Sequence, residues 1–170
     1  MVTLAAAKAD SGTAAIWTSA IAAASALLGA VIGVFGGAWI ERQRERRRRK
    51  RLVYAATVNV FHQYVHALSQ WVIHKTEPKQ IKLEGDWLAK RVVDTDYSAL
   101  AQSGEMQIYC PEGMEQYKAV QQATVPLREH ADAVSDGDDP AQVGVEEEPW
   151  KSLYMTYHKE AQKLAALAPK

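Results

Sequence analysis

The stretch AAIWTSAIAAASALLGAVIGVFGGAWI, residues 14–40, is an uncharged apolar run that decides how the rest of the chain is organised. As a helix rising 1.5 Å per residue it would be about 40 Å long, enough to cross a hydrocarbon core of roughly 30 Å with some tilt. Trp17 and Trp39 stand near its two ends, where membrane helices carry interfacial aromatic anchors. A soluble helix of this length would normally show a polar face. The sequence therefore predicts a single transmembrane helix over residues 14–40.

The residues on either side of this run predict its orientation. Residues 1–13 contain only Lys8 and Asp10 as charged residues, so they lack the cationic segment that opens a cleaved signal peptide. The apolar run also exceeds the roughly 7–15 residues of a signal-peptide core. The other side, residues 41–51, is strongly basic. The positive-inside rule then predicts an uncleaved anchor, with a short extracytoplasmic N-terminus and a cytoplasmic domain over residues 52–170. We expect the protein to reside in a bacterial inner membrane.

The basic juxtamembrane segment offsets an acidic remainder, so that 20 Lys+Arg balance 20 Asp+Glu over the whole chain. Its cations are Arg42, Arg44, Arg46, Arg47, Arg48, Arg49, Lys50 and Arg51. We expect them to act as a stop-transfer signal and to contact anionic lipid headgroups, each cation contributing about 1 kcal/mol near the membrane surface. An Arg cluster can also bind nucleic acid. No aromatic platform is interleaved with this one, so we expect no nucleic-acid partner.

Small residues recur along the predicted membrane helix. Ser25, Gly29, Gly33 and Gly37 are spaced by four, and Gly36 widens the same face. In lipid, helices associate through close backbone contact, which glycine permits. The spacing predicts that this helix associates with a second copy or with another membrane helix.

The chain after the basic segment predicts a helical stem that reaches about His74. Its apolar residues alternate steps of four and three, a heptad pattern that suits a bundle core or a short coiled coil. They are Tyr54, Val58, Phe61, Val65, Leu68 and Val72. Thr76-Glu77-Pro78 should stop the stem. The membrane helix and the stem are expected to form one continuous helix.

Shorter elements are expected to follow the stem. Two short helices are predicted at Trp87–Val93 and Tyr97–Gln102, the second closed by Gly104. Met106–Tyr109 is compatible with a short extended segment, although it is too short and unpartnered to predict a sheet.

Two further helices complete the predicted cytoplasmic domain. Cys110-Pro111-Glu112 indicates a helix start, and Pro126 should kink this helix or end it early. Its inward positions are expected to be Tyr117, Val120, Thr124, Leu127, Ala131 and Val134. Residues 135–149 are predicted to be an acidic flexible loop. Pro149 opens the last helix, with an inner side formed by Trp150, Leu153, Tyr157, Ala161 and Leu164. The predicted fold class is thus all-α, a transmembrane helix continuing into a helical bundle.

Candidate chemistry in the sequence is sparse. The common phosphate-binding, dinucleotide-binding, zinc-protease and serine-hydrolase motifs are missing. His62 and His66 are one helical turn apart and could share a metal with His130, His158 or an acidic residue, but their polar neighbours favour a solvated face. Cys110 precedes a helix start, where the helix dipole would lower a thiol pKa, although a lone cysteine is more often a small apolar residue. We expect no catalytic, cofactor or metal site.

These features favour a non-enzymatic function. The leading hypothesis is a single-pass membrane scaffold or adaptor that presents a small cytoplasmic bundle for assembly or recruitment. One alternative is an oligomeric pore-forming or membrane-perturbing effector assembled through the Gly-rich helix. The other is an accessory subunit of a larger membrane complex.

Overall fold

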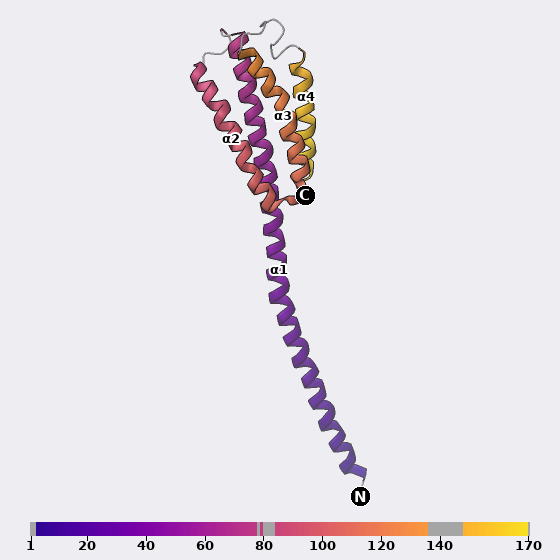
Figure 1. Cartoon of the computed structure of the whole chain (residues 1–170). Helices are drawn as coiled ribbons and strands as arrows, with labels where there is room; N and C mark the ends of the chain where they lie inside the picture. The colour runs from indigo at the N-terminus through magenta and orange to yellow at the C-terminus, as the bar shows by residue number, and fades with distance from the viewer. Residues whose placement is uncertain (1–2, 78, 80–83, 136–147, 170) are drawn as a thin grey trace. The chain divides into compact units, whose positions relative to one another are not determined.

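The computed structural model describes residues 3–77, 79, 84–135 and 148–169, and side chains from Ile16 onward. Within these residues the chain is all-helical (Figure 1). The elements are α1 (Thr3–Thr76), α2 (Gly85–Tyr109), the 3₁₀ turn η1 (Pro111–Gly113), α3 (Met114–Ser135) and α4 (Trp150–Ala166). The predicted all-α class is confirmed, and α1 runs without a break from the apolar stretch into the stem, ending at Thr76.

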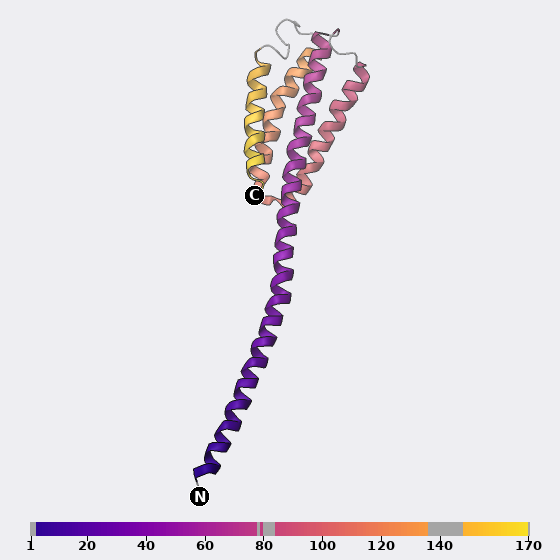
Figure 2. The same ribbon diagram turned by 180° about the vertical axis from the view of Figure 1, so that it is seen from behind.

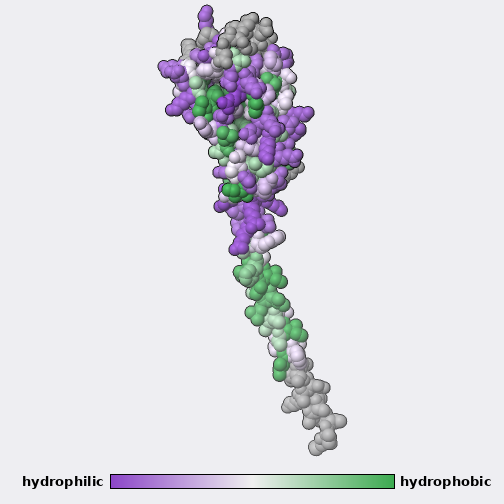
Figure 3. All heavy atoms as spheres, viewed as in Figure 1, coloured by the Kyte–Doolittle hydropathy of each residue, from purple (hydrophilic) through white to green (hydrophobic). Residues whose placement is uncertain are grey.

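The chain divides into two compact units, Met1–Arg46 and Arg47–Lys170. In the first unit, α1 is long and apolar enough to cross a membrane, and none of its most apolar window is buried against other parts of the chain. The apolar stretch is the green part of α1 in Figure 3, and it gives way to purple where the basic segment begins. By length and composition, therefore, α1 is a candidate membrane helix.

The described residues of the second unit form a four-helix bundle. The stem of α1, α2, α3 and α4 run alternately up and down, and α3 lies beside α4 in both views (Figures 1 and 2). This up-and-down order is a common topology of four-helix bundles.

One side of each helix fills the bundle core. From the stem, Tyr54, Phe61, Val65, Leu68 and Val72 are buried, while Val58 is half-buried and packs against them. The six inward residues predicted for α3 are all buried, which confirms that prediction. In α4, Trp150, Tyr157, Ala161 and Leu164 are buried as predicted, and Leu153 is partly buried.

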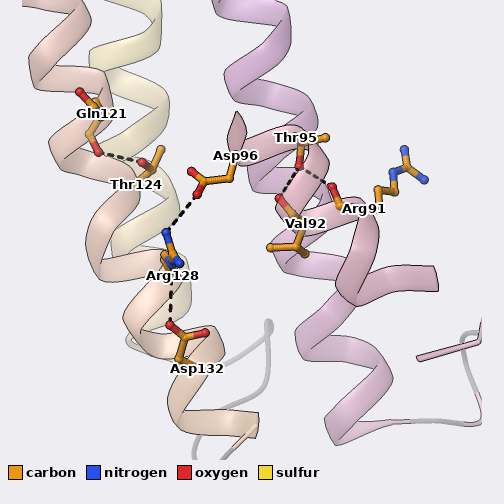
Figure 4. Close-up of polar contacts among 8 residues, drawn as sticks. All are labelled: Arg91, Val92, Thr95, Asp96, Gln121, Thr124, Arg128 and Asp132. Carbon is orange, nitrogen blue, oxygen red and sulfur yellow. Dashed lines mark hydrogen bonds and ion pairs between the residues drawn. The ribbon is translucent and has the colours of Figure 1, made fainter. Parts of the chain in front are cut away.

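The prediction of two short helices and an extended segment in residues 87–109 is wrong, because α2 is one continuous helix through all of it. The polar run Asp94-Thr95-Asp96 suggests a break in the sequence. In the structure the Thr95 hydroxyl donates to the Arg91 and Val92 carbonyls, at 2.8 and 3.0 Å (Figure 4). Asp96 meets Arg128 of α3 at 3.1 Å. Both side chains are therefore satisfied without leaving the helix.

Of the two outcomes predicted at Pro126, a kink or an early end, the early end is wrong, since α3 continues to Ser135. A proline inside a helix removes one backbone hydrogen bond and costs about 3 kcal/mol in isolation. On either side of it, Thr124 and Leu127 are buried against the bundle. In the preceding turn the Thr124 hydroxyl donates to the Gln121 carbonyl at 2.7 Å (Figure 4). Tertiary packing thus outweighs the local preference.

The predicted helix start at Cys110-Pro111-Glu112 lies three residues early, because these residues lead into the 3₁₀ turn η1 before α3 begins. Pro111 opens that turn. Gly113 ends it, pressed against Tyr54 of the stem, where a Cβ would have no room. Most of the predicted acidic loop, residues 136–147, lies outside the described residues.

Candidate functional site

The small-residue face of α1 is open in the structure. A Cβ placed on any of Gly29, Gly33, Gly36 and Gly37 would meet nothing within 4 Å. Ser25 donates its hydroxyl to the Ile21 carbonyl at 2.7 Å, which satisfies it within its own helix. The face therefore presents only backbone and small side chains.

Bulky side chains lie on the other side of the same helix. At about 100° per residue, the four glycines and Ser25 fall within a sector of about 120°. Leu27, Leu28, Val31, Val34 and Phe35 fall outside it, each at least 50% exposed. Trp17 and Trp39, the predicted anchors, are 69% and 64% exposed. One flat side and one bulky side are thus available to another helix or to lipid.

The basic juxtamembrane segment is shared between the two units. Arg42, Arg44 and Arg46 belong to the first unit, and the cations from Arg47 to Arg51 belong to the bundle unit. Within the bundle unit, Lys50 forms an ion pair with Glu112. The sequence alone does not distinguish Lys50 from the other cations of the segment.

Two cations of the segment also contact the bundle. The Arg49 guanidinium lies 5.9 Å from the centre of the Tyr109 ring. The hydrogen bond from Lys50 lowers the pKa of the Glu112 carboxyl. Arg49 and Lys50 therefore join the first turn of the stem to the end of α2 and to η1, in addition to any role at a lipid surface.

Cys110 is fully buried beside this contact. Burial and the nearby Glu112 carboxylate raise the pKa of its thiol. The expectation that a helix dipole would lower this pKa is therefore wrong, because desolvation and a neighbouring anion favour the neutral thiol. Its place in the core is that of a small apolar side chain.

A groove of about 520 Å³ lies between α1 and α4. The stem lines it with His62, His66 and Ser69, spaced by four and three along one face of the helix. The first two turns of α4 line the opposite wall with Lys151 and Tyr154. We refer to this feature as the α1–α4 groove.

Buried residues form the floor of the α1–α4 groove. Val65, Trp150 and Tyr157 line it and are each at most 3% exposed. The Tyr157 hydroxyl is 2.8 Å from Nδ1 of His62. Burial raises the pKa of the Tyr157 phenol, which therefore stays protonated. Burial and the neighbouring His158 lower the pKa of His62.

This hydrogen bond holds the His62 ring against Tyr157, and the imidazole tautomer determines which of the two groups donates.

The structure does not assemble a metal site around His62 and His66. No group of three or more His, Cys, Asp or Glu side chains that could hold a metal occurs among the described residues. The His158 ring lies 6.2 Å from the His62 ring, but it stacks on Tyr154. His130 lies elsewhere, its ring 5.5 Å from that of Trp150. The two histidines instead form one wall of the α1–α4 groove.

The outer face of α2 is apolar, a feature that sequence reasoning missed. Val93, Tyr97, Leu100 and Ile108 are 51%, 69%, 46% and 72% exposed. Their successive steps of four, three and eight residues place them on one side of a continuous helix. Dividing this segment into two short helices hid the common face, and only the unbroken α2 reveals it.

No protein family, curated protein or solved structure matches this chain. The function must therefore be argued from the residues themselves.

Proposed function

We propose that this chain is a single-pass membrane scaffold or adaptor that self-associates through the small-residue face of α1. It holds the four-helix bundle at the cytoplasmic side of a bacterial inner membrane for assembly or recruitment. The N-terminus lies outside. The observation that carries this proposal is the open glycine face on an apolar helix that no other described part of the chain covers.

The shape of that face supports close helix association. Two membrane helices gain most of their attraction from van der Waals contact, because lipid offers no hydrophobic driving force between them. Glycines at Gly29, Gly33 and Gly37 leave the backbone accessible over two full turns. A leucine at any of these positions would stand in the way of a close partner helix.

The flanking charge supports the proposed orientation. Arg42, Arg44 and Arg46 follow the apolar run within about 9 Å of helix. Because the apolar run is itself about 40 Å long, these cations lie at or just beyond the headgroups when the helix is upright. The stretch before the run carries far less positive charge, so the basic side belongs in the cytoplasm.

The test is the mass of the full-length protein in mild detergent, measured by light scattering. Gly29→Leu with Gly33→Leu places two large side chains on the small-residue face. Ala24→Leu with Ala38→Leu makes the same change on the bulky side and serves as the matched control. We expect a defined oligomer for the natural chain and the control, and a monomer for the glycine variant.

Other outcomes separate the alternatives. A monomer for all three proteins would contradict self-association, and the bundle would then have to act with a different partner. An oligomer that survives the glycine variant would place the contact outside the small-residue face. Release of dye from liposomes by the natural oligomer would favour a pore over a scaffold.

A further inference from the structure

The outer face of α2 has the spacing of a helix-pairing seam. α2 lies at an edge of the bundle in both views (Figures 1 and 2). Val93, Tyr97, Leu100 and Gly104 follow one another by four, three and four residues, the alternation that keeps a heptad seam turned towards a partner helix. Ile108 extends the same side by one further turn. We refer to these five residues as the α2 seam.

The described part of the chain leaves the α2 seam open. Its four larger side chains are between 46% and 72% exposed. Gly104 lies among them, and a Cβ placed there would meet nothing within 4 Å. Because glycine has no side chain, a second helix can approach the backbone closely at this point. The seam is therefore an apolar stripe that a further helix can cover.

The α2 seam is too small to join two proteins without a second contact. Its side chains expose on the order of 400 Å² of apolar surface, similar to the largest patch on a typical soluble monomer. Two such faces bury on the order of 800 Å² when they pair, whereas stable and specific interfaces bury about 1,200–2,000 Å². A partner of this face must therefore be held in place by another contact as well.

A second copy of this chain brings that other contact with it. Chains joined through the small-residue face of α1 hold their bundles at a high effective concentration, so that a weak second contact forms within the assembly. A free partner protein would have to bind to the α2 seam alone. The small area of the seam thus favours a second copy as its occupant.

The charges beside the α2 seam favour a parallel pair. Asp94 and Glu105 are exposed and lie on the same side of the seam, within about 20° of each other around the helix. In an antiparallel pair centred on Leu100, that side of each helix faces its copy, so Asp94 of one chain would lie within one turn of Glu105 of the other, where like charges repel. In a parallel pair the opposite sides of the two helices meet. The side opposite Asp94 carries the ion pair between Asp96 and Arg128, in which a cation accompanies the carboxylate.

We propose that the α2 seam pairs in parallel with the α2 seam of a second copy, so that equivalent residues meet each other. Two copies anchored in one membrane with the same orientation are related by an axis along the membrane normal, which also makes the pair parallel. This inference deepens the proposed function and rests on it. The small-residue face of α1 joins the chains, and the α2 seam joins their bundles into one unit.

Cysteine cross-linking of the full-length protein in mild detergent tests the proposal. Tyr97→Cys, Leu100→Cys and Gly104→Cys are oxidised briefly with copper phenanthroline, and linked dimers are separated by electrophoresis in SDS without reductant. An unstrained disulfide needs two Cβ atoms within about 3.5–4.5 Å of each other, so each variant reports whether that residue meets its own copy. We expect all three variants to cross-link.

Ser98→Cys is the matched control. Ser98 is exposed in the middle of the same helix, about 100° around it from Tyr97. The natural Cys110 is fully buried, so the natural chain supplies the baseline. We expect the seam cysteines to cross-link at least about tenfold faster than Ser98→Cys, since pairing holds them at a high effective concentration. Thermal unfolding monitored by near-UV circular dichroism shows whether each variant keeps its fold.

The glycine variant separates this proposal from the function on which it rests. Leu100→Cys combined with Gly29→Leu and Gly33→Leu should lose most of its cross-linking, because the seam is small and the α1 contact is removed. Cross-linking that persists in this protein would support pairing through α2 and would contradict α1 as the contact that joins the chains.

Three results would overturn the α2 proposal. An oligomer by light scattering whose seam cysteines cross-link no faster than Ser98→Cys would exclude pairing through α2 and leave the association through α1 intact. Cross-linking of Leu100→Cys alone would indicate an antiparallel contact and contradict the parallel seam. A monomeric natural chain whose seam cysteines do not cross-link would contradict both proposals.

Discussion

Replacing Gly113 with alanine tests how tightly the bundle closes where α2 turns into α3. A Cβ at Gly113 would lie 2.5 Å from Oη of Tyr54 and 2.9 Å from both Cε1 of Tyr54 and Cε of Met106. Real Cβ atoms essentially never approach other atoms within 3.0 Å, so a neighbour must move. Tyr54 is 1% exposed and Met106 is fully buried, which leaves neither an open direction.

The expected magnitude follows from two opposing effects. Overpacking a closed core costs about 1–3 kcal/mol. Removing a glycine also restricts the unfolded chain, which stabilises the fold by about 0.4–1 kcal/mol where the backbone allows it. The net expectation for Gly113→Ala is a loss of about 1–2 kcal/mol in the free energy of unfolding, within the sum of these ranges.

Gly104→Ala is the matched control and should have the opposite sign. Gly104 lies inside α2, and a Cβ there would meet nothing within 4 Å. Alanine is a better helix former than glycine by about 0.5–1 kcal/mol, so this variant should be more stable than the natural chain.

Tyr54→Phe connects the Gly113 prediction to its cause. The Tyr54 hydroxyl is buried, has no hydrogen-bond partner among the described residues, and is the atom nearest the new Cβ. Its removal should be neutral or stabilising on its own, because a buried unsatisfied group costs about 1–3 kcal/mol. It should also recover part of the loss caused by Gly113→Ala.

The assay is urea unfolding of the full-length proteins in detergent, monitored by near-UV circular dichroism so that the signal reports the bundle. A Gly113→Ala protein that is as stable as Gly104→Ala would refute the packing described around Tyr54. Additive effects of Gly113→Ala and Tyr54→Phe would show that the hydroxyl is not the obstruction.

Three further predictions concern the rest of the bundle. Burial and His158 lower the pKa of His62 in the folded chain, so the imidazole binds a proton more readily in the unfolded chain. The free energy of unfolding should therefore fall as the pH drops below about 6.5. Urea unfolding at several pH values should show this fall, and His62→Gln should reduce it. Leu127→Ala removes a fully buried side chain and should cost about 2–5 kcal/mol, measured by the same unfolding assay; a loss below 1 kcal/mol would contradict its place in the core. Asp96→Asn weakens an exposed ion pair with Arg128 and should change the unfolding free energy by less than about 1 kcal/mol. A larger loss would contradict the small contribution to stability expected of an exposed ion pair.

Much of the fold follows from the sequence where periodicity is strong. The steps of three and four in α3 identify its buried face, and Pro149 correctly marks the start of α4. The errors occur where local signals compete with packing. Asp94-Thr95-Asp96 and Pro126 both suggest breaks, yet each lies in a helix whose inner face is held by the bundle. The helix propensity of a single residue is a weak guide when buried residues on both sides of it hold the helix against the bundle.

The site was less accessible to sequence reasoning than the fold. His62 and His66 were visible as a pair, but the facing wall comes from α4, about ninety residues further along the chain. Nothing in the spacing of either helix shows that Tyr157 contacts His62 or that Lys151 and His66 line the same groove. Such pairings depend on how two helices register against each other, which is a tertiary property. The small-residue face of α1, in contrast, is local to one helix and could be predicted.

Alkaline carbonate extraction tests most directly whether α1 spans a membrane. Membranes from cells that produce the full-length chain are washed at high pH, and the pellet and supernatant are compared. Leu28→Arg with Val31→Arg is the control, because each arginine near the middle of a span costs about 2.5–3.5 kcal/mol of insertion free energy. We expect the natural chain in the pellet and the control variant largely in the supernatant. Release of the natural chain by carbonate would contradict a membrane-spanning α1.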